Sequence, residues 1–363
     1  MRAAGGLATG CLLALSGCST DVPLQETDSA SDGAAYAALG DSYSAGEGTN
    51  SYLPGTDVIG TNVCHRSALA YSQLIARQLG TASDAFVACS GAVTADMFQP
   101  NNNGNLGPDG RAEPAELCQL ELTAGISPCT FSRPSALGPG TKIVTLTIGG
   151  NDAGFAKVLE SCLFSNDGRY RVGLPGRGCR DDPATIARTV RRIAALAGDG
   201  QDTSPYSSAI QSISSVLEAI HTVAPHAQVY IAGYPHVLEP PSADDCVVGA
   251  VTGGATTSIP LKVTAADARA VDNAIQSLNT TIRFAAQSAG AWATYVDPVA
   301  TFEGHGLCTS TSWINPIEAA VSFDASGRSI KVTPNSGSGH PTAEGQDAGY
   351  AAAFLRAGVA AKQ

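Results

Sequence analysis

Short apolar segments that alternate with segments of helical periodicity constrain the fold of this chain more than any other feature. The apolar runs, several of them rich in β-branched residues, lie at Ala34–Leu39, Ala85–Ala88, Lys142–Ile148, Gln228–Ala232 and Trp292–Val296. The helical segments lie at Ala68–Leu79, Pro183–Leu196, Tyr206–Val223, Ala265–Ala289 and Thr342–Ala360. Strands that alternate with helices pair in parallel through right-handed crossovers. The sequence therefore predicts an α/β fold, a three-layer α/β/α sandwich around a five-stranded parallel sheet.

Two stretches interrupt this pattern. Asp96–Gly140 is rich in Asn, Gly and Pro, and Phe155–Asp182 is rich in Gly and Arg and holds two cysteines. We expect both to be loops, which either shape a substrate groove or only cover the surface. No internal repeat or compositional break marks a second domain, so we expect residues 34–363 to form one domain.

The N-terminal segment has the features of an export signal. Arg2 is followed by the short apolar stretch Gly5–Leu15, and Leu15-Ser16-Gly17-Cys18 resembles a bacterial lipobox. The apolar stretch is too short to span a bilayer as a stable helix. We expect residues 1–17 to be a lipoprotein signal peptide, Cys18 to be lipidated and residues 18–33 to be a flexible tether. An ordinary cleaved signal is the alternative, so the exported protein is either lipid-anchored at the cell membrane or extracellular.

Export makes disulfides the expected state of the cysteines. Of the 10 cysteines, the signal contains Cys11 and lipidation would use Cys18, which leaves an even set of eight. No Cys-x-x-Cys motif or Cys/His cluster has the spacing of a zinc site, so we expect no metal. The sequence leaves the pairing open, and sequential pairs are the arrangement that we expect: Cys64–Cys89, Cys118–Cys129, Cys162–Cys179 and Cys246–Cys308.

The charge balance argues against one class of partner. The formal net charge is -11 and the sequence has no basic run, whereas nucleic-acid binding requires clustered Lys and Arg. We therefore expect no nucleic-acid partner, and we expect the protein to be a monomer.

Gly40-Asp41-Ser42-Tyr43 directly follows the first apolar run. A turn at the end of a buried strand lifts the Ser42 hydroxyl out of the sheet, and a following helix aims backbone N–H groups at the same point. Asp41 is expected to cap that turn or helix. The same tripeptide is also common in simple chain reversals, so the turn alone does not identify a nucleophile.

Gly91 and Asn151 each follow another apolar run by a few residues, in Ala88-Cys89-Ser90-Gly91 and Gly149-Gly150-Asn151-Asp152. The carboxyl ends of parallel strands meet at one edge of a sheet, so these residues can converge with Ser42. The N–H groups of Ser42 and Gly91 and the Asn151 amide would then form an oxyanion hole. Their alternatives are a turn glycine and an Asx-turn.

His340 is the candidate general base. It lies just before the last helical segment, where a loop can reach the same edge of the sheet. Among the other histidines, His221 and His226 are expected to be solvated at a helix end. His236 and His305 lie in loops that could border the site, and His65 neighbours an expected disulfide.

These residues together resemble the SGNH (GDSL-type) hydrolase superfamily, whose four blocks would here be Ser42, Gly91, Asn151 and His340. The resemblance extends from about Ala34 to Ala360. Further motifs resemble the secreted actinobacterial branch of lipases, phospholipases and esterases: Cys64-His65-Arg66-Ser67, the cysteine before Ser90, Phe302–Cys308 and Trp313. The resemblance implies a flavodoxin-like sheet and no metal or organic cofactor.

One position departs from the family pattern. Many members have Asp three residues before the histidine, where this chain has Gly337. Some relatives orient the imidazole with a main-chain carbonyl, and we expect that of Gly337 or Ser338 to do so here. Asp297, Glu303 or Asp324 could supply a carboxylate from elsewhere in the chain.

The sequence thus predicts a cell-surface carboxylic ester hydrolase, a lipase or esterase that forms an acyl-serine intermediate on a lipid or small ester substrate. A polysaccharide O-deacetylase and a sugar acyltransferase are alternative enzymes. A non-catalytic lipoprotein that binds glycan or lipid in the same groove is the alternative from another class.

Overall fold

The computed structural model describes residues 33–81, 85–98, 101–106, 112–113, 116, 137–163, 182–199, 210–239, 245–253, 257–323 and 330–360. The chain divides into two units, Met1–Ala30 and Ser31–Gln363, and every described residue belongs to the second. The expected signal peptide, the lipidation of Cys18 and nearly all of the tether therefore lie outside the described residues, as do Cys118, Cys129, Cys179 and Asp324.

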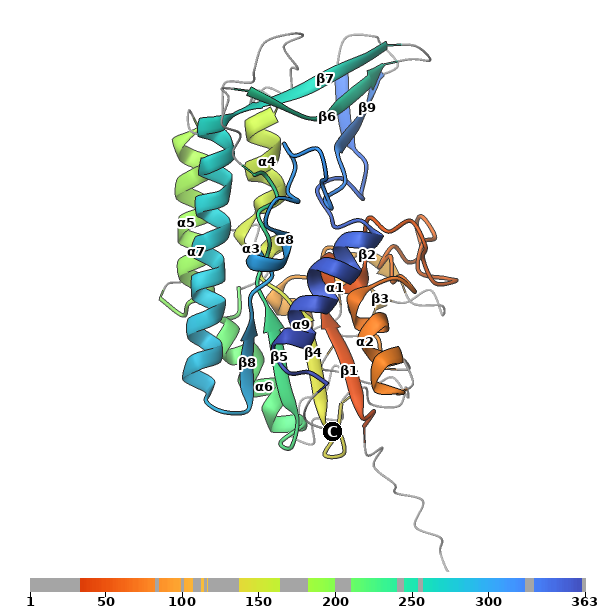
Figure 1. The fold of residues 1–363 in the computed structure, drawn as a ribbon, viewed down its shortest axis with the longest axis vertical. Helices are drawn as coiled ribbons and strands as arrows, with labels where there is room; N and C mark the ends of the chain where they lie inside the picture. The colour runs from red at the N-terminus through yellow and green to blue at the C-terminus, as the bar shows by residue number, and fades with distance from the viewer. Residues whose placement is uncertain are drawn as a thin grey trace, which may run out of the picture. The chain divides into compact units, whose positions relative to one another are not determined.

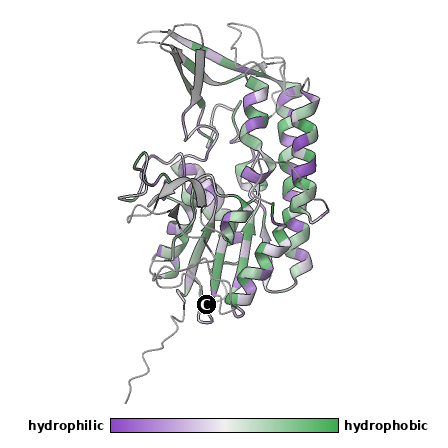
Figure 2. Ribbon diagram, turned by 180° about the vertical axis from the view of Figure 1, so that it is seen from behind, coloured by the Kyte–Doolittle hydropathy of each residue, from purple (hydrophilic) through white to green (hydrophobic). Residues whose placement is uncertain are grey.

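A parallel sheet forms the centre of the described structure, as predicted. Its strands are β1 (Tyr36–Gly40), β4 (Ile143–Thr147), β5 (Gln228–Ala232) and β8 (Ala293–Val296), in the order β1-β4-β5-β8 (Figure 1). Every neighbouring pair is parallel. Residues of β1 and β4 are buried throughout, and the strands of this sheet are largely hydrophobic (Figure 2). Such continuous apolar strands are typical of a sheet covered on both faces.

The expected fifth strand at Ala85–Ala88 is reduced to one bridge. Phe86 pairs in parallel with Ala38 of β1, and within the described residues this is the extent of strand pairing there. The amides of Val87 and Ala88 both donate to the Ala38 carbonyl and the Cys89 N–H donates to the Gly40 carbonyl, so the segment stays hydrogen-bonded to β1 without forming a regular ladder. The described sheet thus has four strands and this bridge, which is compatible with the predicted five-stranded sheet, and the strand order including the bridge is that of a flavodoxin-like sheet.

Helices cover the sheet close to where they were predicted (Figure 1). The helix α7 (Ala265–Ala289) packs on both α5 (Pro183–Leu196) and α6 (Ile213–Val223), and α2 (Tyr71–Leu79) packs against the C-terminal helical segment. That segment is the π-helix η3 (Gly345–Ala351) followed by α9 (Ala352–Arg356). Side chains of Asp182, Ser212 and Thr264 accept hydrogen bonds from the first turns of α5, α6 and α7, which fixes where these helices begin.

Both expected loops contain regular structure. Phe155–Leu163 is a helix, α4, so the prediction of a loop from Phe155 was wrong at its beginning. Apolar residues at Phe155, Val158, Leu159 and Cys162 have helical spacing, but the Gly- and Arg-rich composition farther along hid the signal. The short 3₁₀ helix η1 (Thr94–Met97) overlaps the start of the other stretch, which also contains the two-stranded antiparallel sheet of β2 (Asn101–Leu106) and β3 (Ala112–Glu113).

A second sheet was not anticipated from the sequence. It consists of β6 (Asp245–Gly253), β7 (Thr257–Thr264), β9 (Ile317–Phe323) and β10 (Ile330–Pro334), in the order β10-β9-β6-β7. The pairs β6–β7 and β9–β10 are hairpins, and β6 joins β9 in parallel. The chain leaves β10 and enters the loop that carries His340. Among the described helices, none combines the length and the apolar character needed to cross a membrane.

Candidate active site

The turn after β1 presents Ser42 at the start of the short helix α1 (Ser42–Ala45). Asp41 precedes this helix, and its side chain accepts a hydrogen bond from the Tyr43 N–H at 3.0 Å, so Asp41 is the cap that the sequence predicted. Gly40 has φ +113°, and a Cβ at this position would lie 2.2 Å from the Thr147 carbonyl oxygen. A side chain therefore cannot be accommodated where β1 turns toward Ser42.

The structure brings Ser42 and His340 together from opposite ends of the chain. His340 Nε2 lies 2.8 Å from Ser42 Oγ, and the other ring nitrogen, Nδ1, lies 3.2 Å from the Ser338 carbonyl oxygen. An imidazole held with Nδ1–H on a carbonyl presents an unprotonated Nε2 to the hydroxyl. Burial lowers the pKa of His340 below its ordinary value, which favours this neutral form.

The two carbonyls considered for orienting His340 have different partners. The Ser338 carbonyl faces the imidazole ring, whereas the Gly337 carbonyl accepts the backbone N–H of His340. Of the carboxylates considered as substitutes, Asp297 is paired with Arg283 at 2.8 Å. Glu303 is exposed to solvent, and no hydrogen bond to His340 is described for it.

The expected oxyanion donors lie on two adjoining segments. Asn151 belongs to α3 (Gly150–Ala153) and donates from Nδ2 to the Ala92 carbonyl at 2.9 Å. Ala92 is the neighbour of Gly91, which has φ +80°. An amide nitrogen carries two hydrogens, so this bond orients Asn151 while a second hydrogen can still serve a substrate oxygen. Asn151 and Ser42 line the same cavity.

That cavity has a volume of about 120 Å³ and contains Ser42, Asn151 and His340 in its wall. Much of the remaining wall is apolar and comes from α4, from α7 and from the segment after β5: Phe155, Leu159, Val237, Val271 and Ile275. A nucleophile beside an apolar cavity can meet an ester whose acyl group is hydrophobic.

Asp41 also connects the serine turn to α3. Its carboxylate accepts the Thr147 hydroxyl at 2.6 Å and the Tyr234 hydroxyl, and Tyr234 accepts the Gly150 N–H at 2.9 Å. Burial raises the pKa of Asp41 to about 6, against the opposing effect of these hydrogen bonds. Asp41 is thus a structural cap that fixes the turn to the neighbouring segments.

The remaining histidines have other surroundings within the described structure. His65 and His236 contact the carboxylates of Glu47 and Asp272. His221 stacks on Trp292, and His305 stacks on Trp313. His226 lines a separate cavity that Trp292 also lines.

Two residues near the site were missed in the sequence. Tyr43 donates its hydroxyl to the Gly339 carbonyl at 2.9 Å and so braces the loop that carries His340. Glu47 is buried close to the serine turn. A charged residue between two glycines, in Gly46-Glu47-Gly48, was the signal available for it.

Two expected disulfides have both cysteines among the described residues, Cys64–Cys89 and Cys246–Cys308, and both are formed. Cys162 is also disulfide-bonded, and its expected partner lies outside the described part of the chain. No cluster of three or more His, Cys, Asp or Glu residues within the described ranges is arranged to hold a metal ion.

Comparison with known proteins places the chain in a family. The GDSL-like Lipase/Acylhydrolase family matches residues 38–348. Lipase 1 of Streptomyces coelicolor is 30% identical over 337 residues, which cover 93% of this chain and 90% of that protein. The lipase of Streptomyces rimosus is 28% identical over 342 residues.

Solved structures agree. Phospholipase A1 from Streptomyces albidoflavus NA297 is 29% identical with a TM-score of 0.57, and the match covers 89% of this chain and 99% of that one. The extracellular lipase from Streptomyces rimosus is 26% identical with a TM-score of 0.55, covering 89% and 98%. The resemblance to the actinobacterial branch is confirmed, and the chain belongs to the GDSL-like lipase/acylhydrolase family of ester hydrolases.

Proposed function

We propose that the protein hydrolyses carboxylic esters through an acyl-serine intermediate on Ser42. The observation that carries this proposal is the contact of His340 Nε2 with Ser42 Oγ at 2.8 Å, with Nδ1 turned to a main-chain carbonyl. A hydroxyl in contact with a neutral imidazole can lose its proton as it attacks a carbonyl carbon.

The steps follow from the positions of these groups. Ser42 Oγ attacks the ester carbon while His340 takes the proton, and the carbonyl oxygen becomes an oxyanion. The N–H groups of Ser42 and Gly91 and the Asn151 amide stabilise that charge, and each such donor contributes about 3–4 kcal/mol to the transition state. His340 then returns the proton to the leaving alcohol. A water molecule, activated by the same imidazole, releases the acid from Ser42.

The acyl group is proposed to be a lipid chain. The cavity beside Ser42 has an apolar wall, which supports a hydrophobic acyl group. The names of the similar proteins, lipases and a phospholipase A1, point in the same direction.

A labelling experiment followed by a substrate panel tests the proposal. We expect a fluorophosphonate probe to label the wild type and to fail on Ser42→Ala, while Ser277→Ala, which removes an exposed serine of α7, still reacts as the control. We expect hydrolysis of p-nitrophenyl decanoate to exceed that of acetylated xylan. Preference for the xylan would favour the polysaccharide deacetylase, and absence of labelling and turnover would favour the non-catalytic binder.

The location of the enzyme is a separate proposal. The two formed disulfides are consistent with export into an oxidising compartment. We propose that Cys18 is lipidated after cleavage of residues 1–17, and that residues 18–33 tether a monomeric catalytic domain at the cell membrane. Metabolic labelling with an alkyne fatty acid should mark the wild type, whereas Cys18→Ala should remain unlabelled and be released into the medium.

A further inference from the structure

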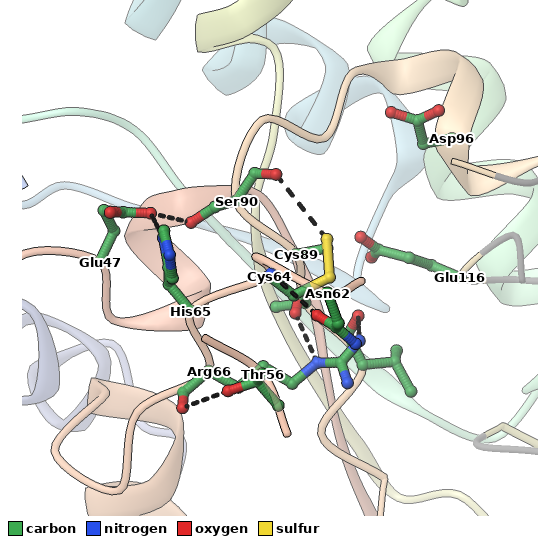
Figure 3. Close-up of a disulfide and its surroundings, with 12 residues drawn as sticks. Glu47, Thr56, Asn62, Cys64, His65, Arg66, Cys89, Ser90, Asp96 and Glu116 are labelled. Carbon is green, nitrogen blue, oxygen red and sulfur yellow. Dashed lines mark hydrogen bonds and ion pairs between the residues drawn. A yellow bond between two sulfur atoms is a disulfide. The ribbon is translucent and has the colours of Figure 1, made fainter. Parts of the chain in front are cut away.

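Glu47 joins two segments of the candidate site from a buried position. It follows α1, is 2% exposed, and its backbone N–H donates to the Ser42 carbonyl at 3.0 Å. Its carboxylate reaches the other way, where Oε2 accepts hydrogen bonds from His65 Nδ1 at 2.6 Å and from the Ser90 hydroxyl. Figure 3 shows the Glu47 carboxylate beside the His65 ring and next to the Ser90 hydroxyl.

The segment that Glu47 contacts is the one that carries Gly91. Ser90 directly precedes Gly91, and its backbone N–H donates to the Cys64 carbonyl at 3.1 Å. The disulfide Cys64–Cys89 fastens the same segment one residue earlier. Beyond Cys89, the Ser90 hydroxyl makes a side-chain contact that ties this loop toward the serine turn.

A buried carboxylate is costly unless it is paired, and His65 provides the pair. Besides contacting Glu47, its ring lies with Nε2 3.2 Å from Asp57 Oδ1 and stacks on Tyr52 with centroids 4.7 Å apart. Burial would lower the pKa of His65, but the hydrogen bond and charge of Glu47 raise it above its ordinary value. Among the described residues, Glu47 Oε1 has no hydrogen-bond partner, so one oxygen carries both contacts.

We propose that Glu47 is a positioning residue for ester hydrolysis: its carboxylate, held by His65, fixes Ser90 and thereby keeps the Gly91 N–H in register with Ser42. The inference rests on the proposed function, because it assigns Glu47 to the oxyanion hole of that reaction. The backbone N–H of Glu47 contacts Ser42, and its carboxylate contacts the residue before Gly91. Glu47 therefore links the segment of the nucleophile to the segment of the oxyanion donor.

A merely structural role predicts something different. If Glu47 and Ser90 only stabilise the fold, their removal lowers the melting temperature and leaves the turnover of the folded enzyme intact. If they position the loop, kcat falls while KM changes little, because an oxyanion donor acts mainly in the transition state.

Ser90 is the residue to change first, because removal of one hydroxyl leaves the backbone and disulfide in place. We expect Ser90→Ala to lower kcat by roughly tenfold or more with KM within about twofold, since small misplacements of catalytic groups are costly. Ser90→Thr keeps a hydroxyl and should recover most of the rate. Asp182→Ala, which removes the cap of α5, is the control that should lower the melting temperature without lowering kcat.

Glu47→Ala completes the test as one corner of a double-mutant cycle, because alanine leaves no oxygen to accept the Ser90 hydroxyl. Because both changes interrupt the same contact, Ser90→Ala with Glu47→Ala should be no slower than the slower single variant. Unchanged kcat in Ser90→Ala, or strictly additive losses in the double variant, would overturn the inference. Ser42→Ala separates the two hypotheses. If the proposed function is wrong, Ser42→Ala keeps activity; if only the role of Glu47 is wrong, Ser42→Ala is still inactive.

Discussion

At the scale of single residues, the imidazole of His340 faces a main-chain carbonyl. The Ser338 carbonyl orients the ring at 3.2 Å, and no carboxylate is described in hydrogen-bond contact with it. A carbonyl fixes the tautomer as a carboxylate would, but it carries only a partial charge and stabilises the imidazolium less. The pKa of His340 is therefore governed first by burial, which lowers it.

This arrangement predicts the pH dependence of kcat/KM. His340 must be neutral to accept the proton, so the acidic limb should lie below the ordinary histidine value of 6.5. Gly337→Asp places a carboxylate three residues before His340 and should move that limb upward, because an opposite charge favours the protonated ring. Gly337→Ala is the steric control and should leave the limb in place. A pH–rate profile that is the same for all three proteins would contradict this account.

Asn151 gives a second prediction at this scale. Removal of an oxyanion donor typically lowers kcat by about 10²- to 10³-fold, and we expect Asn151→Ala to behave in this way with little change in KM. Steady-state kinetics with p-nitrophenyl esters measure both constants. A loss confined to KM would instead show that Asn151 binds the ground state of the substrate.

The candidate catalytic residues could be predicted from the sequence, but the residues that position them could not. Ser42 and His340 lie in short motifs that can be recognised in the sequence, even though the two residues are distant in the chain. Glu47 has no such motif, because its partners His65 and Ser90 become neighbours only when the loops fold around the Cys64–Cys89 disulfide. Contacts of this kind are set by tertiary structure.

At the scale of secondary-structure elements, α4 forms much of the wall beside the serine. Phe155 and Leu159 lie one turn apart on this helix and both line the cavity. α4 thus supplies part of the wall that the acyl group of the proposed ester substrate would contact.

Filling the cavity from α4 should change chain-length preference. We expect Leu159→Trp to lower kcat/KM for p-nitrophenyl decanoate by roughly tenfold relative to the acetate, since one or two lost methylene contacts are worth about 1–3 kcal/mol. Val190→Trp on the exposed face of α5 is the matched control. An equal loss on both esters would indicate general damage to the site.

Elements whose sequence signals lie within one short stretch of chain were predicted best. The bounds of α5, α7 and β5 agree with the sequence, because caps and continuous apolar runs lie in one stretch of chain. The second sheet was missed because β6 pairs with β9 across a long separation, which no local pattern reveals.

At the scale of the whole molecule, several carboxyl groups are buried around the edge of the sheet. Burial raises the pKa of Asp41, Asp96 and Asp152 to about 6 in each case, against opposing hydrogen bonds. The pKa of Glu116, whose carboxylate accepts the Gly40 N–H, is raised as well, again mainly by burial. Between pH 3.8 and about 6, the folded protein therefore holds protons that the unfolded chain would have released.

Stability should depend on pH accordingly. A carboxyl with a raised folded-state pKa favours folding most below its unfolded value of 3.8, and the contribution is lost as pH rises toward about 6. Asp96→Asn keeps a hydrogen-bond acceptor but cannot titrate. We expect the free energy of unfolding of this variant to fall by on the order of 1–3 kcal/mol less than that of the wild type between pH 4 and pH 7. Urea denaturation at pH 4, 5, 6 and 7 measures the difference. An unchanged slope in the variant would show that Asp96 does not titrate in this range.

The pair Ser42–His340 spans 298 positions of the chain. The ribosome makes the hydroxyl-bearing turn well before the imidazole, so a growing polypeptide holds Ser42 without its proton acceptor until residue 340 has been added. A truncated product that stops between these two positions would lack the general base of the proposed reaction and would therefore be inactive.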